Sequence, residues 1–306
     1  MSRDLTPSER EDSREPSGAT REHTPQTERN QPGQNRSPDR NTHLDRDSNS
    51  PRDSRSMESP SQNSRAVLYD RDHAYRLRGS EIHTLTDLGR FRVIATEDLP
   101  KHCYSEDREE TQKDIRNLVR QGLIRRGTFE GPDANPRELL TLTRNGHRLV
   151  RSNRLASGDQ STYHGFVKPK EANHDANIYR LYQKEAERIL DKGGKNLRVI
   201  LDFELKKKLN QDFARFGTAS RPEIAARHSL QVVGNKIPVP DLRIEFETRE
   251  GDMGRVDLEL ATEHYRPRQL AEKARAGFSL YASRIDADRL RRVLDQRELT
   301  AEILTL

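Results

Sequence analysis

The chain has 306 residues, of which 31% are hydrophobic and 34% are charged, and its formal net charge is +5. This length suits two modest domains, and the positive charge favours a nucleic acid or an anionic membrane surface as partner. No run of residues approaches the ~20 apolar residues of a membrane-spanning helix, and the N-terminus lacks the apolar core of a secretory signal. The single cysteine, Cys103, excludes an internal disulfide and fits a reducing compartment, so we expect a cytoplasmic protein in which Cys103 is a small core residue.

The first 64 residues are almost entirely polar, charged or Pro. Leu5, Ala19 and Leu44 are nearly the only apolar side chains among them. Such a segment cannot bury enough apolar surface to offset the conformational entropy that folding removes. We therefore predict a disordered tail over 1–64, followed by the folded part of the chain.

Residues 65–152 carry periodic apolar patterns separated by turn signals. Ser80 is placed to cap a helix whose Ile82, Leu85 and Leu88 recur at helical spacing. Further elements are predicted in this order: an extended piece at 90–94, a short helix from Thr96, a helix at 106–121, strands at 123–128 and 138–142 around a Gly/Pro turn, and a helix from Thr143. Three helices followed by a hairpin predict a winged helix-turn-helix domain over 65–152.

In a helix-turn-helix, the polar face of one helix reads bases in the major groove, and Arg, Asn and Gln make the specific contacts. The outward face of the 106–121 helix is expected to carry Gln112, Lys113, Arg116, Asn117 and Arg120. The hairpin adds three arginines that would neutralise phosphates, namely Arg125, Arg126 and Arg137. The alternative is a solvated helix face, because Glu109, Glu110 and Asp114 lie nearby and would repel phosphate.

Residues 153–170 are rich in Ser, Gly and Asn and are predicted to form a linker. A small α/β domain is expected over 171–306. Its predicted elements are a helix at 174–191, a strand at 197–201, a helix in two pieces at 204–229, strands at 241–247 and 254–261, a helix at 267–284 and a helical end at 286–306. The fold class is therefore α+β. Asn173 or Asp175 is expected to cap the first of these helices, which explains the His174-Asp175 pair without a metal.

The two strands at 241–247 and 254–261 bring carboxylates to one face of a hairpin. Residues two apart in a strand share a face, so Asp257 and Glu259 lie on the same side as Asp241. A turn at 250–253 is expected to place 247 opposite 257 and 241 opposite Glu263. Asp241, Asp257, Glu259 and Glu263 would then form an oxygen-rich patch that suits Mg²⁺ or Mn²⁺, and such an ion activates water against a phosphodiester. The alternative is a solvated face on which Arg243 pairs with the acids.

The same residues resemble the PD-(D/E)xK nuclease fold, in which an Asp after Pro begins one strand and an acid-x-Lys pair lies on the next. Pro240-Asp241 matches the first acid and Asp257 the second, whereas Glu259 stands where Lys is usual. The resemblance implies catalytic roles for Asp241, Asp257 and Glu259, with Lys273 on the following helix replacing the strand lysine. It also makes Glu185 a candidate acid from the first helix.

A second resemblance covers about 75–284. It depends on several short runs that occur in this order: Leu118-Val119-Arg120-Gln121-Gly122-Leu123-Ile124, Leu140-Thr141-Leu142-Thr143, Pro240-Asp241, Asp257-Leu258-Glu259-Leu260-Ala261-Thr262-Glu263, and Lys273 with Tyr281. Together these runs resemble the plasmid replication-relaxation family. The resemblance implies a winged helix followed by a nuclease-like domain, and a role in replication, relaxation or mobilisation of a plasmid-like element.

Three functions therefore stay open. The first is a DNA-binding protein whose nuclease-like domain is inactive, the second a Mg²⁺-dependent nuclease or nickase, and the third a winged-helix transcriptional regulator. The expected partners are double-stranded DNA, replication or mobilisation proteins and a second copy of the chain, with no membrane.

Overall fold

The computed structural model describes residues 64–131, 135–166, 169–262, 265–295 and 303–306, all of which belong to one compact unit, Met57–Leu306. Helices and three β-sheets make up this part of the chain, so the fold is mixed α and β, as predicted. The tail predicted to be disordered, 1–64, lies outside the described residues except for Ser64. Among the described helices, none has both the length and the hydrophobicity that a membrane span requires.

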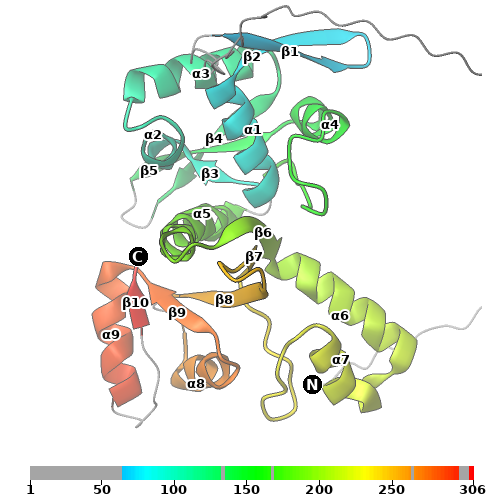
Figure 1. Cartoon of the computed structure of the whole chain (residues 1–306). Coiled ribbons are helices and arrows are strands. Elements are labelled where there is room, and N and C mark those ends of the chain that lie inside the picture. The colour runs from blue at the N-terminus through cyan, green and yellow to red at the C-terminus, as the bar shows by residue number, and fades with distance from the viewer. Residues whose placement is uncertain (1–63, 132–134, 167–168, 263–264, 296–302) are drawn as a thin grey trace, which may run out of the picture. The chain divides into compact units, whose positions relative to one another are not determined.

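A β-hairpin that the sequence patterns did not reveal precedes the first helix (Figure 1). It pairs β1 (Arg65–Asp70) with β2 (His73–Arg78) in an antiparallel two-stranded sheet. Tyr75 and Leu77 of β2 are buried, and they alternate with polar residues on the other face of the strand. The hairpin is therefore attached to the hydrophobic core through one face only.

The next segment contains helices around a small antiparallel sheet (Figure 1). Its elements are α1 (Gly79–Phe91), β3 (Ile94–Ala95), a 3₁₀ turn (Thr96–Asp98), α2 (Leu99–Cys103), α3 (Arg108–Arg120), β4 (Ile124–Glu130), β5 (Pro136–Leu142) and α4 (Arg144–Ser152). The three strands lie in the order β3-β5-β4 and all pair antiparallel. These elements agree with the predicted ones to within a few residues.

Two side-chain caps account for the helix starts that the sequence indicated. Asp107 precedes α3, and its carboxylate accepts a hydrogen bond from the N–H of Glu110. Thr143 precedes α4, and its hydroxyl accepts from the N–H of Gly146. Each cap satisfies a backbone donor that the first helical turn leaves without a partner.

The segment predicted as a linker is packed where the structure describes it, at 153–166. The N–H of Tyr163 donates to the carbonyl of Gly89 at 2.7 Å, and the N–H of Gly165 donates to that of Leu142 at 3.1 Å. Gln160 is buried and bonds both backbone groups of Val199, with its amide nitrogen and oxygen each at 2.9 Å. The Ser, Gly and Asn content of the segment at 153–166 therefore reflects an irregular path packed on the protein rather than a free linker.

The remaining elements form a second, larger α/β part. They are α5 (Pro169–Asp191), β6 (Lys195–Leu201), α6 (Asp202–Phe216), a 3₁₀ turn (Thr218–Ser220), α7 (Arg221–Arg227), β7 (Leu242–Glu247), β8 (Met253–Ala261), α8 (Pro267–Arg275), β9 (Ser279–Ala282), α9 (Arg284–Asp295) and β10 (Ile303–Thr305). The sheet order is β10-β9-β8-β7-β6. β6, β7 and β8 pair antiparallel, whereas β9 is parallel to β8 and β10 is parallel to β9.

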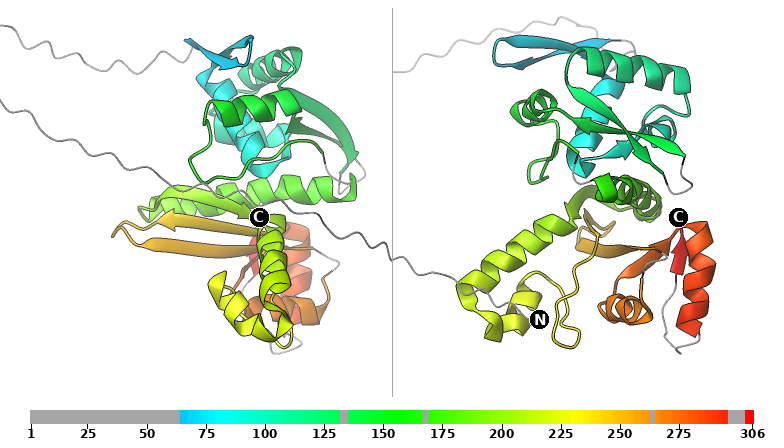
Figure 2. Two further views of the ribbon diagram at one scale, coloured as in Figure 1. Left: turned by 90° about the vertical axis from the view of Figure 1, so that its right-hand side faces the viewer. Right: turned by 180° about the vertical axis from the view of Figure 1, so that it is seen from behind.

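Helices cover both faces of this sheet (Figures 1 and 2). Leu242 and Leu258 pack in one core with Tyr179 of α5, and this core continues into α1, α3 and β5. On the other face, Leu280 packs with Leu270 of α8 and with α9. Asp241 and Glu259 lie on the same face of the sheet as Leu280. This face is covered by α8 and is not open to solvent.

Two predicted helices are wrong in part. The predicted helix at 267–284 ends at Arg275, and Gly277, with φ +82°, turns the chain into β9. The helical end predicted over 286–306 consists of α9 followed by β10. Both strands are short, and a short apolar run does not distinguish a strand from a helix by periodicity.

Candidate functional site

The outward face of α3 carries exposed cations. Lys113, Arg116 and Arg120 are exposed, and Gln112 is partly exposed. Lys113 pairs with Glu109 of the same helix at 2.7 Å, and this surface pair is open to solvent. Arg116 forms no hydrogen bond or ion pair within the described part of the chain.

Asn117 does not lie on this face, contrary to the prediction. It is buried, and its amide nitrogen donates to Glu81 Oε1 of α1 at 2.5 Å. Its amide oxygen accepts a hydrogen bond from Arg120 at 2.8 Å. Asn117 therefore anchors α3 to α1 and cannot read a base from this position.

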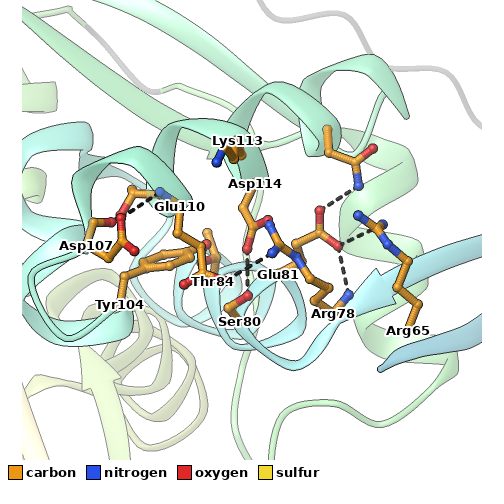
Figure 3. Close-up of polar contacts among 12 residues, drawn as sticks. Arg65, Arg78, Ser80, Glu81, Thr84, Tyr104, Asp107, Glu110, Lys113 and Asp114 are labelled. Atoms are coloured by element: carbon orange, nitrogen blue, oxygen red, sulfur yellow. Dashed lines mark hydrogen bonds and ion pairs between the residues drawn. The ribbon is translucent and has the colours of Figure 1, made fainter. Parts of the chain in front are cut away.

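A buried polar network holds the inner side of α3 (Figure 3). Arg78, the last residue of β2, forms ion pairs with Glu110, at 3.0 Å, and with Asp114. Ser80 donates to Asp114 Oδ2 at 2.6 Å. Two of the three acids expected to repel phosphate, Glu110 and Asp114, are therefore paired with Arg78. The network also fixes which face of α3 points outward.

The three arginines predicted on the hairpin have different environments. Arg125 is exposed and stacks on the ring of Phe166, 5.0 Å from its centroid. Arg126 is half-exposed and pairs with Glu138 at 3.2 Å. Arg137 is buried and bonds Glu97 at 3.0 Å and Asp98 at 3.3 Å, so it links structural elements and is not available to phosphate, contrary to the prediction.

The acidic hairpin has a different register from the predicted one. The structure pairs Glu247 with Met253 and Arg243 with Asp257. This register follows from a tight turn, in which the N–H of Thr248 donates a hydrogen bond to the carbonyl of Asp252 at 2.7 Å. The register places Asp241 beside Glu259: the N–H of Asp241 donates to Glu259 Oε2 at 3.2 Å. Glu263, the predicted partner of Asp241, lies outside the described residues.

Asp257 is separated from this pair of acids. Arg243 Nε donates to Asp257 Oδ1 at 2.6 Å, and Nη2 donates to Oδ2 at 2.9 Å. Arg243 also donates to the carbonyls of His228 and Ser229, at 2.7 and 3.2 Å. Asp257 therefore serves a buried ion pair, and the second acid beside Asp241 is Glu259.

Lys273, which the resemblance to the nuclease fold proposed as the replacement lysine, contacts Glu259 from α8. Its Nζ lies 2.6 Å from Glu259 Oε1 and donates to the carbonyl of Val239 at 2.7 Å. The hydroxyl of Tyr265 donates to the same Glu259 oxygen at 2.5 Å. From α5, His174 Nε2 lies 3.6 Å from Asp241 Oδ1. We call these five residues, Asp241, Glu259, Lys273, Tyr265 and His174, the Asp241 cluster.

The two carboxylates of the Asp241 cluster differ in their protonation. Burial, with the nearby Asp241 charge, raises the pKa of Glu259 to about 7, although Lys273 and Tyr265 act in the opposite direction. Burial also disfavours the charge of Asp241, but hydrogen bonds from His174 and from the N–H of Leu260 hold the pKa of Asp241 below its usual range. Near neutral pH, Asp241 is therefore the charged acid, and Glu259 titrates.

Mg²⁺ or Mn²⁺ does not fit the Asp241 cluster as it is arranged. Carboxylate oxygens are the right donors for such an ion. Three of the four oxygens of Asp241 and Glu259, however, already have a donor within the protein: the N–H of Leu260 for Asp241 Oδ2, and Lys273, Tyr265 and the N–H of Asp241 for Glu259. The fourth oxygen, Asp241 Oδ1, lies 3.6 Å from His174 Nε2. A divalent ion would have to displace Lys273 or His174, and Asp257 is not free to join it.

Sequence reasoning missed two members of this cluster. His174 was assigned to the capping segment of a helix, but α5 begins at Pro169, so His174 lies inside it. Tyr265 belongs to no motif that the sequence analysis considered. Glu185 does not join the cluster: it accepts a hydrogen bond from the hydroxyl of Tyr281 at 2.5 Å.

No model of a known protein family matches the chain, and neither a curated protein sequence nor a solved structure matches it. Inferences about function therefore depend on the residues of this chain.

Proposed function

We propose that residues 79–152 form a winged helix-turn-helix that binds double-stranded DNA, with α3 as its recognition helix. The order of helices and strands supports this fold, as does the sheet order β3-β5-β4, in which β4 and β5 form the wing. The observation that carries the proposal is the exposed cationic face of α3, because Arg116 projects from it without a partner in the described residues. Arg is the side chain that most often reads guanine in the major groove.

The anchoring of α3 supports this orientation. Gln112, Arg116 and Arg120 follow one another at intervals of four residues and therefore lie along one side of the helix. On the opposite side, Asp114 and Asn117 bond Arg78, Ser80 and Glu81. A helix held by its inner face presents its outer face at a fixed angle, and docking into a groove requires such a rigid arrangement.

The wing supplies phosphate contacts in this proposal. Arg125 is exposed beside Phe166, and Arg126 lies on the same strand with Glu138 as its neighbour. Such contacts position a protein on DNA without reading its sequence, and they make the affinity fall as the salt concentration rises. Arg126 would have to break its ion pair with Glu138 to contact a phosphate. It would therefore contribute less to the affinity for DNA than an unpaired arginine.

We further propose that the second half of the chain is a nuclease-like scaffold that binds no divalent ion in this arrangement. Asp241 after Pro240 and Lys273 from α8 correspond to the first acid and the relocated lysine that the resemblance implied, whereas Glu259 stands beside Asp241 in place of Asp257, the second acid of the resemblance. The internal donors and the charged neighbours around both carboxylates favour the inactive form. The replication-relaxation resemblance supports a role for such a protein in replication, relaxation or mobilisation of a plasmid-like element.

The alternative is a Mg²⁺- or Mn²⁺-dependent nuclease, and the convergence of Asp241, Glu259 and Lys273 favours it. One experiment separates the two functions. The purified full-length chain is incubated with supercoiled plasmid, with and without Mn²⁺, and both retardation and nicking are measured on gels. We expect retardation without nicking. Nicking that Asp241→Asn abolishes would establish the enzyme, and absence of retardation at low salt would remove the DNA-binding function.

A further inference from the structure

A second group of potential metal ligands lies in the first half of the fold, away from the acidic hairpin. His83 and Asp87 are four residues apart on α1, so they lie on one side of that helix. Cys103 is the last residue of α2, which lies beside α1 (Figure 1). Within the described ranges, these three are the group of His, Cys, Asp and Glu side chains whose ligand atoms all lie within 4.8 Å of one another.

The distances match the edges of a small coordination tetrahedron. His83 Nε2 lies 3.7 Å from Asp87 Oδ2, and Cys103 Sγ lies 3.7 Å from the same oxygen. Around a tetrahedral Zn²⁺ with bonds of ~2.0 Å to N and O and ~2.3 Å to S, these two edges would measure roughly 3.3 and 3.5 Å. Shifts of a few tenths of an ångström would therefore bring these two edges to their coordination lengths, and the third edge, between the ligand atoms of His83 and Cys103, is no longer than 4.8 Å.

The charge at this position also favours a cation. The Asp87 side chain is 3% exposed, and a buried carboxylate requires compensation. Arg90 approaches only its Oδ1 atom, at 3.5 Å. The Oδ2 atom accepts hydrogen bonds from the uncharged groups of Tyr179, at 3.1 Å, and Cys103. His83, whose side chain is 54% exposed, gives an ion a route from solvent.

We propose that His83, Asp87 and Cys103 form a binding site for Zn²⁺. Zinc is the ion that accepts nitrogen, oxygen and thiolate ligands in one tetrahedral site. The Tyr179 hydroxyl, 3.5 Å from Cys103 Sγ, lies beside the fourth position, which a water molecule also suits. The ion would join α1 to α2 and so reinforce the layer on which α3 is anchored. The site is independent of whether the Asp241 cluster binds a metal.

Cobalt(II) is the probe for this site, because a cobalt–thiolate bond gives a charge-transfer band in the near ultraviolet. Cys103 is the only cysteine of the chain, so the band reports on this residue alone. We expect untagged full-length protein to develop the band with one equivalent of Co²⁺ and to lose it when Zn²⁺ is added. Cys103→Ser should abolish the band, and His83→Ala should weaken Co²⁺ binding by roughly tenfold or more.

Two controls keep the test specific. His102→Ala removes the neighbouring histidine outside the group and should leave Co²⁺ affinity unchanged. Asp241→Asn should also leave the band unchanged, which separates this site from the acidic hairpin. Absence of the band in the wild-type protein would overturn the proposal. Equal Co²⁺ affinity of His83→Ala and the wild-type protein would overturn the proposal as well, because it would show that Co²⁺ binds to the thiol alone. The His83 side chain is exposed, so its removal should leave the protein folded.

Discussion

Arg243 and Asp257 form a two-point ion pair across the β7–β8 hairpin, with hydrogen bonds of 2.6 and 2.9 Å. The guanidinium is 4% exposed and the carboxylate 11%, so the pair is almost completely removed from water. This pair occupies the position at which the nuclease resemblance expected a catalytic acid. Its presence leaves Asp241 and Glu259 as the two acids that face each other.

Asp257→Ala should destabilise the fold strongly, because it leaves the Arg243 charge buried without its partner. Breaking a buried pair from one side costs about 3–5 kcal/mol, and the two carbonyls that Arg243 also contacts compensate only part of this. Urea unfolding of the full chain measures the loss. The matched control is Glu245→Ala on the neighbouring strand β7, where Arg198 and Glu245 form a pair and are both partly exposed. Its expected cost is below about 1 kcal/mol. Equal effects of the two variants would contradict the buried-pair interpretation.

The sequence predicted local elements well where apolar periodicity and caps agreed. The spacing of Leu85 and Leu88 predicted α1, and Thr143 marked the start of α4. It failed at β9 because Ser279–Ala282 is too short to show a period, and at β1 because its apolar residues, Ala66 to Tyr69, form one short run without alternation. These strands are defined by pairing with distant residues, which a local pattern does not contain.

The candidate site was predictable in its chemistry but not in its register. Alternation along the strands placed Asp241, Asp257 and Glu259 on one face, and the structure agrees. The pairing depended on the number of residues in the turn, and an error there moved the predicted partner of Asp241 from Glu259 to Glu263. His174 joins from α5 through tertiary packing alone, so no spacing in the sequence indicated it.

Gln160→Ala tests whether the segment at 153–166 is part of the fold. Gln160 satisfies both backbone groups of Val199 on the outer edge of β6, and its removal leaves buried donors and acceptors without partners. Each such loss costs about 1–3 kcal/mol, so the melting temperature should fall by several degrees. The neighbouring Asp159→Ala is the control, since Asp159 is exposed and its loss should change little. A true linker would give no difference between the two variants.

Arg116→Ala and Arg126→Ala should affect DNA binding differently. Loss of Arg116 should cost roughly 1–3 kcal/mol on a preferred site and reduce the discrimination between sequences. Loss of Arg126 should weaken binding to all DNA about equally and flatten its dependence on salt. Fluorescence anisotropy with labelled duplexes at several salt concentrations measures both effects.

Arg215→Ala on α6 is the matched control for these two variants, because it removes an exposed arginine stacked on Phe216 outside the proposed DNA-binding segment. If all three variants bind DNA as the wild-type protein does, α3 and the wing are not the contact surface.

The pKa of Glu259 makes the stability of the protein depend on pH in a predictable direction. Its pKa rises from 4.5 to about 7 on folding, so between these values the unfolded chain loses a proton that the folded chain keeps. Stability from this group is therefore fully present below pH 4.5 and is lost as the pH rises through 7. The pKa of His174 is also raised on folding, through its contact with Asp241. The stability that His174 contributes is therefore also lost as the pH rises above the ordinary pKa of a histidine.

Glu259→Gln removes this titration while it keeps the shape of the side chain and one of its two acceptor oxygens. At about 1.4 kcal/mol per pKa unit, the pH-dependent loss from Glu259 is on the order of 3 kcal/mol. We expect the free energy of unfolding of the wild-type protein to fall more steeply between pH 4.5 and pH 7 than that of Glu259→Gln. Urea unfolding at half-unit pH intervals gives both curves. Parallel curves would mean that Glu259 is ionised throughout this range, and the carboxylates of the Asp241 cluster would then carry the charge that a divalent metal ion requires.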